Sequence, residues 1–215
     1  MNQKKTIKRR SIVIMGEWCF AFTLDKLPED NKGIFSSWNK KFPLKWQVLK
    51  VENSKAFVVC KEILCNRKFD TDNKHNVWND TDLRNWLNTI FIERAFNDKE
   101  KEKILITPII TELDREGETI ISEETQDKIF ILSTRELWNY LPKNSIDCDV
   151  PYWLRDRSDD FISSYFPVYS MEYLNIYKEP HISTERAPTE NLGIRPAMWI
   201  DISERSELNI QSNLK

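Results

Sequence analysis

Glycine, histidine and long apolar runs are scarce in this 215-residue sequence. Only four glycines occur, so the chain has neither a Gly-rich phosphate-binding loop nor a flexible Gly/Ser linker. The two histidines, His75 and His181, lie in polar sequence without a nucleophile signature, which argues against Ser/His/Asp or Cys/His catalysis. No apolar run approaches the ~18 residues of a membrane-spanning helix. These absences argue against several classes of enzyme and against a membrane-spanning protein.

The cysteines and the net charge give little support for metal, cofactor or nucleic-acid binding. The four cysteines, Cys19, Cys60, Cys65 and Cys148, form no C-x-x-C pair, so no zinc or redox motif is visible and no cofactor is predicted. The formal net charge of −2 argues against a general nucleic-acid binder. The apolar stretch near the N-terminus is interrupted at Gly16 and lacks a signal-peptide cleavage site. A reduced, cytoplasmic protein is therefore favoured.

The composition is that of one globular domain. Hydrophobic residues make up 40% of the chain and eight residues are tryptophan, so we expect a core rich in aromatic side chains. A chain of this length can bury enough surface to fold without disulfides or a metal. We predict a single domain over residues 11–203, a basic flexible N-terminus over 1–10 and a flexible C-terminal tail over 204–215.

Short apolar runs in the first part of the chain predict strands. Residues 12–15 form one such run, and residues 46–51 and 56–60 form a hairpin around a turn at Asn53-Ser54. The run over 56–60 is apolar throughout, which indicates a buried strand in the middle of a sheet.

The clearest helix is predicted over residues 81–96. Its apolar residues follow the spacing of one helical face: Leu83, Trp86, Leu87, Ile90 and Phe91. A second, short helix begins at Asp98 and carries a solvated run of charges.

The second half of the chain contains further elements. Polar residues 111–127 predict a long surface loop, with a small hairpin as the alternative, and residues 128–132 predict a strand. Ser133 and Glu136 form a capping box that opens a helix with Leu137, Trp138 and Leu141, which Pro142 ends. Two more strands are expected, over 152–155 and over 194–202, where Pro196 marks an edge, a bulge or a strand start. No clear periodicity marks residues 156–192.

Three tryptophan-centred motifs follow one another along the chain. The first is Trp78-Asn-Asp-Thr-Asp-Leu-Arg84-Asn-Trp86-Leu-Asn88, the second is Tyr152-Trp153-Leu-Arg155, and the third is Gly193-Ile-Arg195-Pro-Ala-Met-Trp199. With the strand pair that begins at Trp46, they make the chain resemble a family of bacterial domains of unknown function. The resemblance covers roughly residues 12–203.

This family resemblance implies an architecture similar to the C-type-lectin-like fold, which formylglycine-generating enzymes share. We therefore expect an α+β fold with a twisted, mostly antiparallel sheet, two main helices and long irregular loops. The chain departs from the family after Arg155, where Asp156 and neighbouring acidic residues replace a Ser-Pro and glycines. In lectin-like folds this region often forms ligand-facing loops, and fold alone does not define function.

The aromatic region over 152–190 supplies the binding candidates. Aromatic side chains in irregular segments provide contact area and hydrogen-bonding tips, although they also pack such loops onto a sheet. The predicted ligand-binding residues are Tyr152, Trp153, Arg155, Asp156, Asp159, Asp160, Tyr173 and Tyr177. The three aspartates offer oxygen ligands for calcium, with a merely solvated acidic loop as the favoured alternative. Structural roles are predicted for Trp78, Arg84, Trp86, Asn88, Arg195 and Trp199.

The favoured functional hypothesis is a non-enzymatic recognition module that binds a protein or a glycan through residues 152–190. One alternative is an enzyme on a formylglycine-generating scaffold, although the cysteines match no copper-site pattern. Another is a small bacterial or phage accessory or regulatory protein that acts through protein–protein contacts. The high Lys, Asn and Ile usage is typical of an AT-rich bacterial or phage genome.

Overall fold

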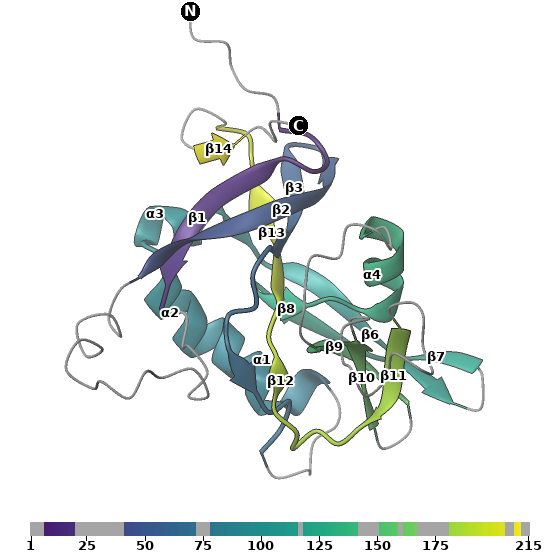
Figure 1. Ribbon diagram of the computed structural model, residues 1–215. Helices are drawn as coiled ribbons and strands as arrows, with labels where there is room; N and C mark the ends of the chain where they lie inside the picture. The colour runs from purple at the N-terminus through teal and green to yellow at the C-terminus, as the bar shows by residue number, and fades with distance from the viewer. Residues whose placement is uncertain are drawn as a thin grey trace, which may run out of the picture.

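A computed structural model of the chain describes residues 7–19, 41–71, 78–115, 118–141, 151–158, 161–166, 181–204 and 209–211. Over these ranges the protein has the predicted α+β fold, in which strands form two mostly antiparallel sheets and helices pack beside them (Figure 1). Among the described helices, none combines the length and apolar character that a membrane crossing requires.

The first sheet contains the predicted hairpin at its centre. Its seven strands run in the order β14-β1-β2-β3-β13-β5, and β8 also pairs with β13. The strands are β1 (Ile12–Trp18), β2 (Phe42–Glu52), β3 (Lys55–Cys60), β5 (Ile104–Leu105), β8 (Phe130–Ile131), β13 (Pro196–Asp201) and β14 (Asn209–Gln211). Pro196 begins β13, which is the strand-start alternative of the sequence prediction.

Two residues connect β2 to β3, and both have positive φ angles. The φ values are 45° at Asn53 and 62° at Ser54, as the two-residue turns that match the twist of a hairpin require. The backbone carbonyl of Ser54 accepts a hydrogen bond from the Ile202 N–H at 2.8 Å. The residue that follows β13 therefore holds the turn in place by a hydrogen bond from outside the hairpin.

One 14-residue helix, over residues 82–95, confirms the predicted main helix. It consists of α1 (Asp82–Trp86), a π-helical segment η3 (Leu87–Phe91) and α2 (Ile92–Ala95). A 3-10 turn η2 (Trp78–Asp80) precedes it, and the Thr81 hydroxyl caps it by accepting from the Arg84 N–H. The predicted stripe is buried except for Ile90, whose side chain is 45% exposed. The wider π turn shifts the helical phase and moves Ile90 off the apolar face.

Two shorter helices begin with capping boxes. The helix α3 (Asp98–Lys103) is capped by Asn97 with Glu100, and α4 (Thr134–Tyr140) is capped by Ser133 with Glu136. The second of these capping boxes confirms the sequence prediction. In α4 the side chain of Leu137 is buried, whereas Trp138 remains 37% exposed.

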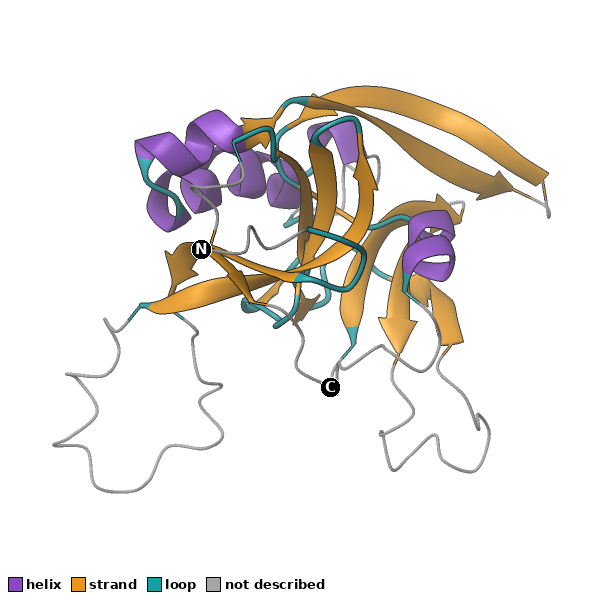
Figure 2. Ribbon diagram, turned by 90° about the horizontal axis from the view of Figure 1, so that it is seen from above, coloured by secondary structure: helices purple, strands orange, loops and turns teal. Residues whose placement is uncertain are grey.

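The second sheet follows the order β11-β10-β9-β12-β4, and β6 joins it by pairing with β9. Its strands are β4 (Asn66–Arg67), β6 (Thr107–Arg115), β7 (Glu118–Asp127), β9 (Tyr152–Ser158), β10 (Phe161–Phe166), β11 (His181–Arg186) and β12 (Leu192–Gly193). β6 and β7 pair along their whole length and extend as a two-stranded ribbon away from the body (Figure 2).

This ribbon replaces the predicted long surface loop over 111–127 and is longer than the small hairpin that the sequence suggested there. The alternation that marks a strand is weak in this stretch, because polar and acidic residues predominate in it. Two more strands, β10 and β11, lie in the region without clear periodicity, and β14 lies in the predicted C-terminal tail, where it pairs with β1. Long-range pairing forms these strands, which local patterns do not reveal.

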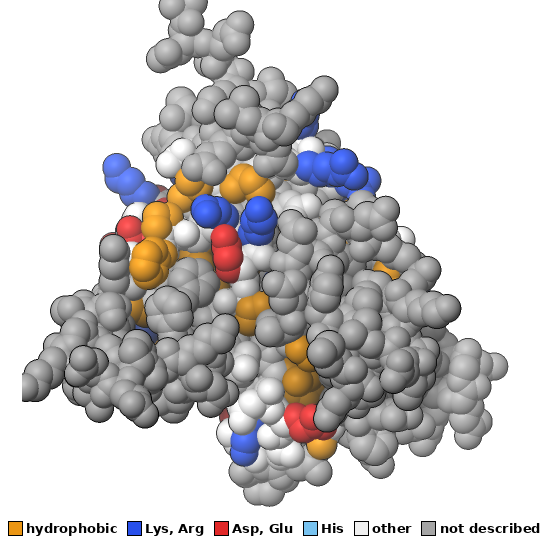
Figure 3. Space-filling model, viewed as in Figure 1, with side chains coloured by type: hydrophobic (Ala, Val, Ile, Leu, Met, Phe, Trp, Pro, Cys, Tyr) orange, Lys and Arg blue, Asp and Glu red, His pale blue; other side chains and the backbone are white. Residues whose placement is uncertain are grey.

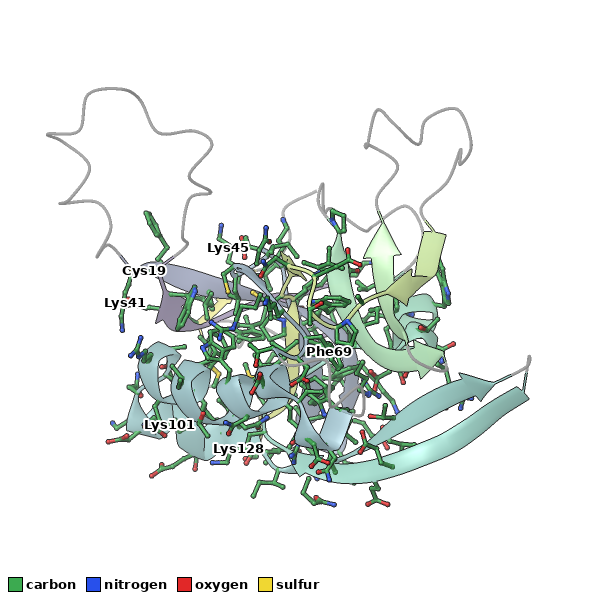
Figure 4. All side chains as sticks on the ribbon, turned by 90° about the horizontal axis from the view of Figure 1, so that it is seen from below. Cys19, Lys41, Lys45, Phe69, Lys101 and Lys128 are labelled. Carbon is green, nitrogen blue, oxygen red and sulfur yellow. The ribbon has the colours of Figure 1, made fainter. Side chains whose placement is uncertain are left out.

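The core is rich in aromatic side chains, as expected from the composition. Phe69 lies at the centre of the molecule, whereas the labelled lysines lie at its periphery (Figure 4). The Phe69 ring is fully buried and packs within 6.0 Å of Trp78 and within 5.6 Å of Trp153, measured between ring centroids. These contacts join the first two tryptophan motifs in space.

Candidate functional site

The first tryptophan motif is tied to the ribbon through a buried carboxylate. Asp127, at the end of β7, is 1% exposed. Its Oδ1 accepts from Arg84 Nε at 2.7 Å, and its Oδ2 accepts from Trp78 Nε1 at 2.9 Å and from the Thr125 hydroxyl at 2.7 Å. The carboxylate thus connects η2, α1 and β7, and the structural roles of Trp78 and Arg84 stay predictions.

Asn88 bonds the same helix to the chain that follows the ribbon. Its Oδ1 accepts from the backbone N–H groups of Lys128 and Ile129, each at 3.0 Å, and its Nδ2 donates to the Ile129 carbonyl at 2.8 Å. Trp86 packs against Phe91, and the Arg67 guanidinium lies 4.4 Å from its ring centroid. Both side chains thus make internal contacts, and the structural roles assigned to Trp86 and Asn88 stay predictions.

The second motif lies in β9, and its two aromatic side chains are buried. Tyr152 and Trp153 are each 1% exposed, and Trp153 Nε1 donates to the Arg67 carbonyl at 2.8 Å. Tyr152 lies beside Arg195 of the third motif, whose guanidinium is 5.6 Å from the tyrosine ring centroid. Arg195 is buried and donates to the Cys60 carbonyl at 2.9 Å, and its structural role stays a prediction.

Arg155 connects β9 with α4 and the ribbon. Its side chain is 4% exposed and donates to the carboxylate of Glu136 at 2.5 Å and to the carbonyls of Ile131 and Ile110 at 2.8 and 3.1 Å. Glu136 belongs to the α4 capping box, so one carboxylate serves both the helix end and the arginine. The arrangement directs Arg155 toward the interior of the molecule.

Asp156 is also buried, with 7% of its surface exposed. Its Oδ2 accepts from the Thr134 N–H at 2.5 Å, whereas its Oδ1 has no hydrogen-bond partner among the described residues. Burial raises the pKa of the Asp156 carboxyl above its ordinary value of 3.8, against the opposing effects of Arg155 and of the Thr134 amide. The folded protein therefore binds a proton at Asp156 more tightly than the unfolded chain does.

This raised pKa predicts a pH-dependent effect of Asp156→Asn. Stability from the neutral carboxyl is fully present below the unfolded pKa of 3.8 and is lost as pH rises through the higher folded pKa. Asparagine does not titrate, so the stability of the variant relative to the wild type should increase with pH across that window. Urea unfolding of both proteins at pH values from about 3 to about 7 measures this. A difference that stays constant, or that changes in the opposite direction, would contradict the prediction.

Four of the predicted ligand-binding residues, Asp159, Asp160, Tyr173 and Tyr177, lie outside the described residues. The calcium alternative depends partly on two of them and stays a prediction. Among the residues that the structure describes, no group of three or more His, Cys, Asp or Glu side chains is placed to hold a metal ion. The four described candidates are brought together in β9, where their side chains point into the protein.

The three cysteines within the described ranges are thiols rather than members of disulfides. Cys60 is buried in β3, and Cys19 and Cys65 are half-buried. Burial raises the pKa of Cys65 to about 11, although Arg67 opposes this shift. The Cys65 thiol is therefore protonated, and a poor nucleophile, at neutral pH. Cys148 lies outside the described residues.

A hollow of about 260 Å³ opens beside the β2–β3 turn. It is lined by Glu52, Asn53, Lys55, Leu105, Ile106, Thr107, Pro108 and Trp199. The β2–β3 hairpin contributes the first three of these residues, the segment from β5 into β6 contributes the next four, and β13 contributes the tryptophan. Trp199, for which a structural role is predicted, stacks on Phe57 and also lines this hollow.

Exposed apolar side chains continue from this hollow along the ribbon. Ile106 is 66% exposed and Ile110 is 46% exposed, and Pro108 between them is also exposed. Ile109 and Thr111 are buried, so the strand alternates between an inner and an outer face. We call Ile106, Pro108 and Ile110 the outer β6 surface. The sequence analysis assigned no element to residues 106–110, because Ile-Thr-Pro-Ile-Ile shows no alternation of apolar and polar residues that would mark a strand.

The face of the molecule shown in Figure 3 presents a different surface. On the face shown in Figure 3, basic, acidic and hydrophobic side chains intermingle over β1 and β2. The Lys45–Glu62 pair, with 3.8 Å between Nζ and Oε1, is one such mixed contact between exposed side chains. The apolar side chains of the outer β6 surface are therefore the more distinctive feature.

Comparison with known proteins identifies the chain by family. No curated protein and no solved structure matches it. One family model matches residues 53–202, a stretch that holds the 14-residue helix, the ribbon, β9 and β13. Because this match covers more than half of the sequence, the chain belongs to the family described as a domain of unknown function (DUF6273).

Proposed function

We propose that this protein is a non-enzymatic recognition module that binds a partner protein or a glycan through the outer β6 surface and the adjoining hollow. The observation that carries the proposal is the exposure of Ile106 and Ile110 on one face of a strand, beside a hollow lined by Trp199. Contiguous exposed apolar side chains next to a concave site are typical of interaction surfaces.

The folded chain leaves the apolar side chains of the outer β6 surface exposed to water. Burying apolar surface contributes roughly 25 cal/mol per Å² removed from water. Across the ribbon, Pro108 pairs with Gln126 and Ile110 pairs with Glu124, and both partners are exposed polar residues. The apolar residues are thus bordered by polar groups, which is the arrangement of an interface core with a polar rim.

Residues 152–190 remain part of the proposal, but without the residues whose side chains are buried. The side chains of Tyr152, Trp153, Arg155 and Asp156 are buried by internal contacts, so a ligand would have to reach other residues of that region. The backbone of β9, β10 and β11 forms an antiparallel series with β11 at one edge. Our proposal therefore centres on the outer β6 surface, whose exposed side chains the structure describes.

A C-type-lectin-like architecture also remains a proposal. The α+β fold, the curled antiparallel sheet and the pairing of β1 with β14 near the two ends of the chain support it. An experimental structure compared with lectin-like domains would test it directly. A different strand order in that structure would exclude the relationship.

The test of the recognition surface uses a pair of matched exposed isoleucines. We expect wild-type protein, used as bait in a lysate of the source cells, to retain a partner that Ile110→Lys and Ile106→Lys lose. Ile90→Lys is the control, because Ile90 is 45% exposed and Ile110 is 46% exposed, yet Ile90 lies on the helix. Circular dichroism of each variant checks its folding.

The outcomes of this capture separate the possibilities. Loss of the partner in both β6 variants, with retention by the Ile90 variant, would support the outer β6 surface. Equal capture by all four proteins would place the interface elsewhere. Absence of any captured protein would contradict a protein partner and leave the glycan as the proposed ligand.

A further inference from the structure

We infer that the hollow beside the β2–β3 turn binds a single neutral sugar ring of a glycan. This inference rests on the proposed recognition function and names the ligand class for one part of that surface. Its basis is the combination, in one hollow, of an indole ring, two side chains of opposite charge, an amide and a hydroxyl.

The charges around the hollow favour a neutral ligand. Glu52 and Lys55 contribute one negative and one positive group, so the lining side chains have no formal net charge. Outside the lining, Lys50 pairs with Glu52 and Asp201 lies opposite Lys55 across the strands, so these two further charges also balance. A neutral ligand with several hydroxyl groups can donate to the carboxylate and accept from the ammonium without an uncompensated charge.

The indole ring of Trp199 supplies an apolar surface, and packing against its neighbours fixes the position of the ring. Its ring stacks on Phe57 with 5.3 Å between centroids and an interplanar angle of 14°. Phe57 and Leu105 are the cross-strand neighbours of Trp199, and the half-buried indole lines the hollow between them. A sugar ring has an aliphatic C–H face and a hydroxyl periphery, which match an aromatic platform surrounded by polar groups.

The size of the hollow limits the ligand to a small group. Its volume of about 260 Å³ lies below the range of pockets that enclose drug-sized ligands, roughly 300–1,000 Å³. One ring can occupy it while the remainder of a glycan lies in solvent or along the outer β6 surface. The apolar residues Leu105, Ile106 and Pro108 form the side of the hollow toward that surface.

The turn presents its polar side chains from a preformed backbone. Asn53 and Ser54 both have positive φ angles, and Ile202 braces the turn through the Ser54 carbonyl. A rigid turn reduces the entropy that ligand binding would otherwise cost. Asn53 lines the hollow and Ser54 does not, although the two residues are adjacent and share the same backbone region.

This difference provides a matched pair of variants. Asn53→Gly removes the amide that faces the hollow, and Ser54→Gly removes a side chain outside it. Glycine accepts positive φ at both positions, so neither change should disturb the turn. Both purified full-length variants are compared with the wild type.

The probes are the methyl glycosides of glucose, galactose, mannose and N-acetylglucosamine, each titrated to high millimolar concentration. The readout is the indole N–H resonance of Trp199 in an amide-correlation NMR spectrum, assigned with Trp199→Phe. We expect at least one glycoside to shift this resonance saturably while leaving the buried Trp78 indole unchanged. Asn53→Gly should weaken that binding by about tenfold, the effect of losing one hydrogen bond to a ligand, and Ser54→Gly should leave it unchanged.

Two results would overturn the inference. If none of the glycosides shifts the Trp199 resonance in the folded wild-type protein, the hollow is not a sugar site. If a shift occurs but Asn53→Gly and Ser54→Gly bind equally well, the ring does not occupy the hollow as we infer. Capture of a protein through Ile106 and Ile110 would still support the proposed function in either case, so failure of the inference and failure of the function are distinguishable.

Discussion

Replacing Asp127 with alanine is expected to lower the free energy of unfolding by about 3–5 kcal/mol, the usual cost of removing one partner of a buried ion pair. The carboxylate is 1% exposed and accepts from Arg84, Trp78 and Thr125. Its removal leaves the Trp78 indole N–H and the Thr125 hydroxyl buried without their acceptor, and it leaves Arg84 without its countercharge. Urea denaturation followed by tryptophan fluorescence measures the loss.

Two companion variants separate charge from hydrogen bonding at Asp127. Asp127→Asn keeps an acceptor oxygen and removes the charge, so it should lower the free energy of unfolding by less than Asp127→Ala does. Asp98→Ala is the surface control, because the Asp98 side chain is 96% exposed and its pair with Lys101 spans 3.2 Å. An exposed pair of this kind contributes about 0–1 kcal/mol. Equal losses for Asp127→Ala and Asp98→Ala would contradict the structural role of the buried carboxylate.

Replacing Arg155 with methionine is expected to destabilise the protein by about 3–4 kcal/mol, because several buried acceptors lose one donor group. Methionine retains much of the apolar stem, so the loss reports mainly on the guanidinium. Without it, the carbonyls of Ile110 and Ile131 lose their bonds, and the Glu136 carboxylate, 24% exposed, loses its cation. Thermal or urea unfolding provides the measurement.

Arg135 supplies the matched control for this variant. Its side chain is 64% exposed, and its Nη1 lies 2.9 Å from Glu112 Oε1. Arg135→Met should cost less than about 1 kcal/mol because solvent screens the pair. If the two methionine variants lost the same stability, the interior network around Arg155 would not be a major source of stability.

The Arg155 result also bears on the predicted ligand-binding region. A strongly destabilised Arg155 variant that lost binding would report on folding rather than on ligand contact. Binding tests of the 152–190 region therefore need variants of residues that lie at the surface. For the outer β6 surface this difficulty is small, because Ile106 and Ile110 are already exposed in the folded protein.

Local patterns in the sequence were sufficient for the elements whose interactions lie close together along the chain. The capping box of Ser133 with Glu136 needs residues three apart, and the turn at Asn53-Ser54 needs two residues that tolerate positive φ. The main helix followed from the spacing of its apolar residues, with Ile90 as the exception that the π turn moved. The three tryptophan motifs were also enough to indicate the family, and the match over residues 53–202 confirmed it.

Only the tertiary structure decided which polar residues are buried and which apolar residues remain in water. Asp127 resembles any other residue of an acidic stretch until β7 brings it against Trp78 and Arg84, 49 and 43 residues away. Asp156 follows the predicted strand over 152–155 in a stretch without clear periodicity, yet β9 continues through it and places Arg155 and Asp156 beneath α4. The hollow joins residues from three separate parts of the chain, so no local pattern could predict it. Burial depends on packing between distant segments, whereas helices, caps and turns depend on neighbours.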